Sequence, residues 1–320
     1  MQDFENIISR VTQQNADEKA KSEPSKPENR KFTEEQRKEY GKMMAEKRQY
    51  CYDLIAQGYR SLAVNVDAMR DFLRVESRFE KKSVNNNLLI MMQNPEATEL
   101  KTSKEWEKAG GKVVEDPDKV FILESSHFTK GDVKRVGFNI KELIDISDVK
   151  DVQPAYRKTY KDYGENSMIV AVLDNCSVPI ERTEQNLGDL PAIYDEKDNK
   201  IYYNRCSDFP KIFTALAKAR AHVEMKRSNQ EYRAFDYEFH ARCAAYIVAE
   251  KYGVDTKDVE IFGIPQKFAE LDEKALKAEI EKLHNGAKDV SAIMLNYFEK
   301  DKEKGGKETR VKKETQREDR

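Results

Sequence analysis

Basic and amide side chains are concentrated between residues 70 and 93. Three arginines there, Arg70, Arg74 and Arg78, are spaced i, i+4, i+8, which places them along one face of a helix. Proteins that bind single-stranded DNA combine a cationic surface with planar side chains for stacking, and amides donate to phosphates or base edges. The sequence therefore offers a candidate surface for single-stranded DNA. Its residues are Arg70, Arg74, Arg78, Lys81, Lys82, Asn86, Asn87, Gln93 and Trp106.

The same residues also fit a purely structural interpretation. Acidic residues interleave with the arginines, so this helix face can equally be a solvated surface covered by ion pairs. These acidic residues are Asp67, Asp71, Glu76 and Glu80. Tryptophan is on average a highly buried residue type, so Trp106 can belong to a core instead of a stacking surface. Both interpretations stay open at this point.

Thiol and imidazole groups elsewhere form no pattern typical of a zinc ribbon or a disulfide framework. The four cysteines are widely spaced and include no Cys-x-x-Cys pair. His240 and Cys243 lie three residues apart in one expected helix, and we interpret them as structural. We therefore expect four reduced thiols, most of them buried, as in a cytoplasmic protein.

The composition excludes some classes of function. Charged residues make up 36% of the 320 residues and hydrophobic residues 38%, which predicts long exposed helices or disordered ends. The net charge is only -2, so the chain is not a globally basic nucleic-acid binder, although a local basic face remains compatible with it. No apolar run is long enough to span a membrane, and the N-terminus lacks the pattern of a signal peptide.

The hydrophobic periodicity of residues 33–150 predicts helices followed by a small sheet. Apolar residues recur at helical spacing in residues 33–57, 64–79 and 87–93, and Gly58 is expected to end the first helix. Thr102 and Glu105 have the spacing of a capping box, which predicts a short helix bearing Trp106. Strands are expected at residues 119–124 and 133–138.

Residues 151–298 predict a mainly helical domain with a β-hairpin. A turn-rich loop separates two short strands at residues 192–194 and 200–204. The apolar run Ser167–Leu173 is short and rich in β-branched residues, so we expect a strand there. Helices are expected at residues 207–227, 231–252, 272–284 and 291–298.

The expected fold class is therefore α+β, with two domains and two tails. Residues 1–32 are polar and are expected to be disordered apart from a short helix at Phe4–Val11. Residues 33–150 and 151–298 form the two expected domains. Residues 299–320 are nearly all charged, and we expect a frayed helix that continues into a disordered tail.

The stretch Phe79–Leu123 resembles the N-terminal domain of ArdC-type antirestriction proteins of plasmids and conjugative elements. A polar segment, an apolar helix, a Gln-x-Pro-x-Ala-Thr turn, a Trp helix and a Gly-x-x-Val phrase follow in the same order. The matching residues are Ser83, Asn86 or Asn87, Leu89, Ile90, Gln93, Pro95, Ala97, Thr98, Trp106, Gly110 or Gly111 and Val113. The resemblance covers about residues 60–150 and implies binding of single-stranded DNA.

In ArdC-like and LtrC-like proteins a zincin-like metallopeptidase domain follows, which implies the same for residues 151–298. Its marks are a hairpin, a His-Glu-x-x-His helix and a glutamate on the next helix. Aligned on His222, the motif reads Lys218-Ala219-Arg220-Ala221-His222 here, with Glu238 as the third position. A protonated lysine has no lone pair for a metal, and alanine cannot act as a general base. His240 is a poor substitute, because it lies two residues from Glu238 and faces another side of the helix.

These patterns leave three hypotheses. The first is a cytoplasmic accessory protein of a mobile element that binds single-stranded DNA, with a catalytically inactive zincin-like domain, no metal cofactor and no membrane contact. Restriction or conjugation proteins are its expected partners. The second is a zinc metallopeptidase with a non-standard site. The third is a protein-interaction adapter that binds no DNA.

Overall fold

The computed structural model describes residues 33–130, 133–188, 190–257, 259, 261 and 263–318. The short helix predicted at Phe4–Val11 lies outside these residues. Contacts divide the chain into two units, Met1–Glu46 and Lys47–Arg320. The described part of the first unit is the beginning of helix α2 (Glu34–Val64), and the remaining elements belong to the second unit.

Two further helices follow α2, as the periodicity predicted. Helix α3 (Val66–Phe79) is capped by Asn65, whose side chain accepts hydrogen bonds from the backbone N–H groups of Asp67 and Ala68. Helix α4 (Val84–Gln93) is capped by Ser83. The prediction that Gly58 ends the first helix is wrong, because α2 continues to Val64. A Cβ atom at Gly58 would lie 3.0 Å from Leu88 Cδ2, so the glycine permits close packing on α4.

A three-stranded antiparallel sheet follows, with the order β1-β4-β3. Its strands are β1 (Leu100–Lys101), β3 (Lys119–Lys130) and β4 (Val133–Asp145). Strands β3 and β4 contain the two predicted strands and are longer than expected. The predicted capping box is present at Thr102 and Glu105 and begins helix α5 (Ser103–Lys108). The short strands β2 (Lys112–Val113) and β5 (Val149–Lys150) pair antiparallel. A 3-10 turn at Ile146–Asp148 directly precedes β5.

The run Ser167–Leu173 is helical, so the predicted strand is wrong. It lies in helix α7 (Glu165–Leu173), directly after the short helix α6 (Tyr160–Tyr163). The buried side chains Met168, Ala171 and Val172 have helical spacing, and α7 packs on α8. Packing of this face therefore overrides the β preference of the branched residues.

The predicted hairpin is present and has one additional strand. Strands β7 (Ala192–Asp195) and β8 (Lys200–Tyr203) pair antiparallel, and β6 (Ile180–Arg182) pairs parallel with β8. Helix α8 (Phe209–Arg227) lies within the predicted range 207–227 and is capped by Asp208, which accepts from the Lys211 N–H. Helix α9 (Ala234–Lys251) follows it.

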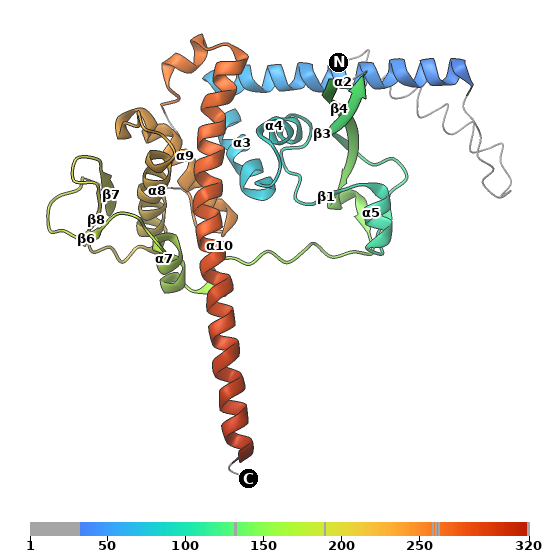
Figure 1. The fold of residues 1–320 in the computed structure, drawn as a ribbon. Helices are drawn as coiled ribbons and strands as arrows, with labels where there is room; N and C mark the ends of the chain where they lie inside the picture. Colours follow the sequence, from blue (N-terminus) through green and yellow to red (C-terminus); the bar gives the residue numbers. More distant parts are fainter. Residues whose placement is uncertain are drawn as a thin grey trace. The chain divides into compact units, whose positions relative to one another are not determined.

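The last helix, α10 (Glu273–Glu318), is continuous after a 3-10 turn at Gln266–Glu270. The prediction of two helices at residues 272–284 and 291–298 is therefore wrong, and α10 also continues through the segment expected to fray. Gly286 lies inside it, where an added Cβ atom would collide with Met225 of α8. Helices α8, α9 and α10 pack on one another, and α3 packs on α9 (Figure 1).

The mixed α+β fold class is confirmed by these helices and small sheets. Across the part of the chain that the structure describes, none of the helices combines the length and hydrophobicity that a bilayer span requires.

Candidate functional site

Four lysines from four different segments line one groove, which we call the lysine groove. Lys82 follows α3, Lys101 ends β1, Lys108 ends α5 and Lys141 lies on β4. The floor is apolar and includes Leu100, Ile122 and Leu143, and the cavity volume is about 580 Å³. Glu105 is the one acidic residue among the lining residues. The groove is therefore a positively charged depression with an apolar base.

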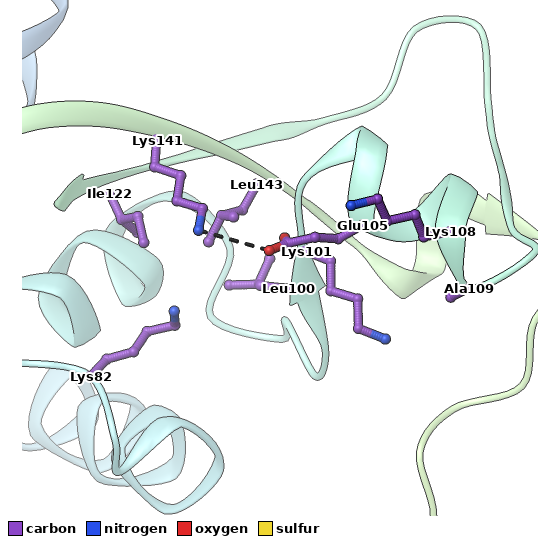
Figure 2. Close-up of a pocket in the computed structure, with 9 residues that line it drawn as sticks. All are labelled: Lys82, Leu100, Lys101, Glu105, Lys108, Ala109, Ile122, Lys141 and Leu143. Atoms are coloured by element: carbon purple, nitrogen blue, oxygen red, sulfur yellow. Dashed lines mark ion pairs between the residues drawn. The ribbon is translucent and has the colours of Figure 1, made fainter.

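Two of these lysines face each other. Figure 2 shows the amino groups of Lys82 and Lys141 pointing toward the same space. Burial lowers the pKa of Lys82, and the positive charge of Lys141 lowers it further. A bound anion would relieve both effects, because it would solvate the ammonium groups and offset their repulsion.

Some charged side chains of the groove already form ion pairs with other protein groups. Lys141 lies 3.9 Å from Glu105 and 3.7 Å from Glu124, which are long ion-pair distances. Lys101 pairs with Glu99 at 2.6 Å, and its ammonium lies 4.2 Å from the centre of the Trp106 ring. Glu105 also accepts the backbone hydrogen bond of Thr102 in the capping box. The ammonium groups of Lys82, Lys108 and Lys141 are therefore the ones in the groove most available to a bound anion.

The amide residues predicted to contact DNA have internal partners. Asn86 donates to the Leu123 carbonyl at 3.0 Å and accepts from its N–H at 2.9 Å. Gln93 makes the same pair of bonds with Phe121, at 2.9 and 3.0 Å. Strand β3 is an edge strand, so these amides replace a missing strand partner along it. Their polar groups stabilise the fold and are not free for bases.

Asn87 and Trp106 are buried, contrary to the expectation of DNA contact. Asn87 is 0% exposed and donates to the Phe79 carbonyl at 3.3 Å. Trp106 is 1% exposed, and its indole N–H donates to the Ile144 carbonyl at 2.9 Å. No base can stack on a ring in this position, so the structural interpretation of Trp106 is the correct one.

The three arginines of α3 do not join the lysine groove. Arg70 pairs with Asp67 at 2.9 Å, and Arg74 lies 3.5 Å from Asp71, as the interleaved acids indicated. Arg74 and Arg78 line a separate cleft. Lys81 is exposed and lies outside the lining of both.

Other groove residues were missed from the sequence. Lys101 and Lys108 flank the capping box, which was recognised only as a helix signal. Lys141 is placed by the pairing of β3 with β4, where it lies opposite Ile122. That register cannot be read from the local sequence.

A second polar cluster joins α8 and α9 at the positions aligned with a zincin motif. The Glu238 carboxylate lies 2.9 Å from the Lys218 ammonium and 3.1 Å from His222 Nε2, and Arg242 adds a third contact at 3.0 Å. Burial by itself raises the pKa of Glu238, but the His222 hydrogen bond and the Lys218 charge outweigh it and hold that pKa well below its usual range. The structure thus brings Lys218, His222 and Glu238 together, and their correspondence to a zincin motif stays a prediction.

The surroundings of His222 favour its neutral form. Burial lowers its pKa, with Glu238 acting in the opposite direction. In the neutral form Nε2–H donates to Glu238, and Nδ1 accepts from the Tyr232 hydroxyl. Both ring nitrogens are therefore engaged by protein groups.

The donor set of this cluster does not fit a three-ligand metal site. Lys218 contributes an ammonium and no lone pair, and the neighbouring Ala219 is buried. His240 belongs to a different contact, 3.0 Å from Glu279 of α10, and Cys243 is a buried free thiol. Within the described ranges, no group of three or more His, Cys, Asp or Glu residues is arranged to hold a metal ion.

Comparison with known proteins gives similarity at the level of structure. No protein-family model and no curated protein matches the chain. The metal-free structure of the antirestriction protein ArdC from the R388 plasmid is 12% identical over 66% of this chain and 85% of that chain, with a TM-score of 0.47. The Mn(II)-bound structure of the same protein is 12% identical, with coverage of 66% and 84% and a TM-score of 0.46.

These matches are similarities of structure at low sequence identity. They also correct one expectation. We expected no metal cofactor, and this is contradicted because the second ArdC structure is the Mn(II)-bound form.

Proposed function

We propose that the chain binds single-stranded DNA through the lysine groove and acts as an antirestriction-like accessory protein of a mobile genetic element. The observation that supports this most is the convergence of four lysines, with one carboxylate, over an apolar floor. The ArdC-like sequence motifs lie in the segment that builds this groove. Restriction or conjugation proteins are the partners that such a role implies.

Phosphate contacts dominate this proposed interface. The amides that could read bases are used along the edge of β3, and the Trp106 ring is buried. Lysine binds phosphate as a point charge and carries no sequence information. We therefore propose weak binding with little sequence preference.

The α8–α9 helices are proposed to act as a zincin-like scaffold without peptidase activity. In the alignment with the motif, Lys218 stands at the first histidine and Glu238 at the third position, and these two residues form an ion pair. Ala219 stands at the glutamate that would activate water and has no group that can do so. The cluster therefore links the two helices and performs no hydrolysis.

A titration of the full chain with a labelled oligonucleotide tests the DNA proposal. Three phosphate contacts, at Lys82, Lys108 and Lys141, predict a log–log salt slope of about -2, because each contact adds about 0.7 on a single strand. Tight binding of a duplex in place of the single strand, or no binding at low salt, would refute the proposal.

A further inference from the structure

A second cleft, which we call the arginine cleft, lies apart from the lysine groove. It is formed by the end of α3, the loop after α4, the segment 154–159 and the end of α9. Its cavity volume is about 590 Å³, within the usual range for small-molecule sites. None of the four groove lysines lines it.

Two guanidinium groups in this cleft are held by backbone carbonyls. Arg78 donates to the Pro95 carbonyl and, through Nε, to the Arg74 carbonyl at 3.2 Å. Arg157 donates to the Thr98 carbonyl at 2.5 Å. A carbonyl fixes the direction of a guanidinium without neutralising its charge, so each arginine keeps its positive charge and further N–H donors.

Arg78 and Arg157 line the same cleft, and their like charges repel. Burial lowers the pKa of Arg78, Glu96 acts in the opposite direction, and the charge of Arg157 lowers it again. Such like-charge proximity is unfavourable in the empty cleft and becomes favourable when an anion lies between the groups.

Most carboxylates of the cleft are committed to other partners. Glu99 accepts from Lys101 at 2.6 Å and from the Ala155 N–H at 2.9 Å. Glu250 accepts from the Thr256 hydroxyl at 2.6 Å. The cationic Lys251 is likewise occupied by Glu80 at 2.7 Å. The Thr256 hydroxyl is uncharged, so the charge of Glu250 still acts on the cleft, and Glu250 and the exposed Glu96 both oppose an incoming anion.

We infer that the arginine cleft binds a phosphate monoester between Arg78 and Arg157. A monoester carries up to two negative charges and three acceptor oxygens near neutral pH, which suits two guanidinium forks better than the single charge of a diester. The phosphate belongs either to a small phosphorylated molecule or to the end of a nucleic-acid strand. This site is independent of strand binding in the lysine groove.

Isothermal titration of the full chain tests this inference with three probes: inorganic phosphate, a nucleoside 5′-monophosphate, and one oligonucleotide with either a 5′-phosphate or a 5′-hydroxyl. We expect Arg157→Gln to weaken monoester binding by about tenfold or more, because charge-assisted hydrogen bonds are lost. Lys158→Gln is the matched control, because it removes one positive charge from the next residue in the chain. The Lys158 side chain lies over Tyr163 and does not line the cleft. Glu96→Gln should strengthen binding, because it removes one of the opposing charges.

The probes distinguish the source of the phosphate. A 5′-phosphate that raises oligonucleotide affinity only while Arg157 is present indicates a strand end, and binding of the mononucleotide alone indicates a small molecule. Absence of binding by every probe, or equal losses in Arg157→Gln and Lys158→Gln, would overturn the inference. Neither result would bear on the lysine groove.

Discussion

Individual polar side chains in this molecule often satisfy the backbone. Asn86 and Gln93 lie seven residues apart on α4 and pair with alternate residues of the β3 edge. The sequence correctly marks them as unusual polar groups in an apolar helix. It does not show that their partners are Leu123 and Phe121, because that depends on how α4 lies along the sheet.

Replacement of Asn86 by alanine is expected to destabilise the protein. The change leaves the Leu123 N–H and carbonyl without this partner in a partly buried place, which costs about 1–3 kcal/mol. Urea denaturation measures the difference. Asn139→Ala, on an exposed position of β4, is the control and should change the unfolding free energy by less than about 0.5 kcal/mol.

Gly111 provides a second test at a single residue. A Cβ atom there would lie 2.6 Å from Val149 Cγ1 and 3.2 Å from the Trp106 carbonyl oxygen. We expect Gly111→Ala to lower the unfolding free energy by about 1–3 kcal/mol through overpacking. Gly41→Ala, in α2 with nothing within 4 Å, should be neutral or stabilising. Equal behaviour of the two variants in thermal unfolding would contradict the packing seen at Gly111.

At the scale of elements, the sequence predicted helix caps and turns reliably, because these depend on a few neighbouring side chains. The Thr102 capping box and the hairpin around residues 195–199 are present as predicted. Errors arose where packing decides. Gly58 was interpreted as a helix end, yet it lies within α2, where the missing side chain admits Leu88. Gly286 likewise lies within α10, beside Met225. A glycine that stops a helix and one that permits close contact look alike in sequence.

A buried pair between α3 and α10 makes stability depend on pH. His284 Nδ1 lies 2.7 Å from the Glu76 carboxylate, and Glu76 is 1% exposed. Burial lowers the pKa of His284, but the Glu76 hydrogen bond and charge outweigh it and raise the pKa above the ordinary value of 6.5. The stabilisation is therefore complete below about pH 6.5 and is lost as pH rises through the higher folded-state pKa.

We expect the unfolding free energy of the wild type to fall as pH rises above about 6.5 because of this pair. His284→Gln should show a flatter profile, since glutamine does not titrate. His127→Gln removes an exposed histidine and should leave the profile unchanged. A wild-type profile no steeper than that of His284→Gln would show that the pair contributes no such dependence.

At the scale of the whole molecule, the near-neutral net charge of -2 conceals separate basic depressions. The sequence indicated local basic character near residues 70–82. The structure places Lys82 in the lysine groove and Arg74 and Arg78 in the arginine cleft, whereas Arg70 and Lys81 line neither. Lys141 and Arg157 complete these sites from distant parts of the chain. Composition alone therefore predicts neither site.

The division into domains at about residues 147–164 stays a prediction. Residues 153–158 are exposed, so limited proteolysis is expected to cut there. Contacts from α3 to α9 and α10, including Lys251–Glu80 and His284–Glu76, join the two sides of this cut. We therefore expect both fragments to co-elute on native size exclusion, and fragments that separate at once would show that these contacts are weak.

The most direct test of the central claim compares the salt dependence of single-stranded DNA binding between two double variants. Lys82→Gln/Lys141→Gln removes two groove charges and should reduce the magnitude of the log–log slope by about 1.4. Lys197→Gln/Lys274→Gln removes two exposed charges elsewhere and should leave the slope unchanged. A slope that is the same in both variants would contradict the assignment of the lysine groove as the DNA-binding surface.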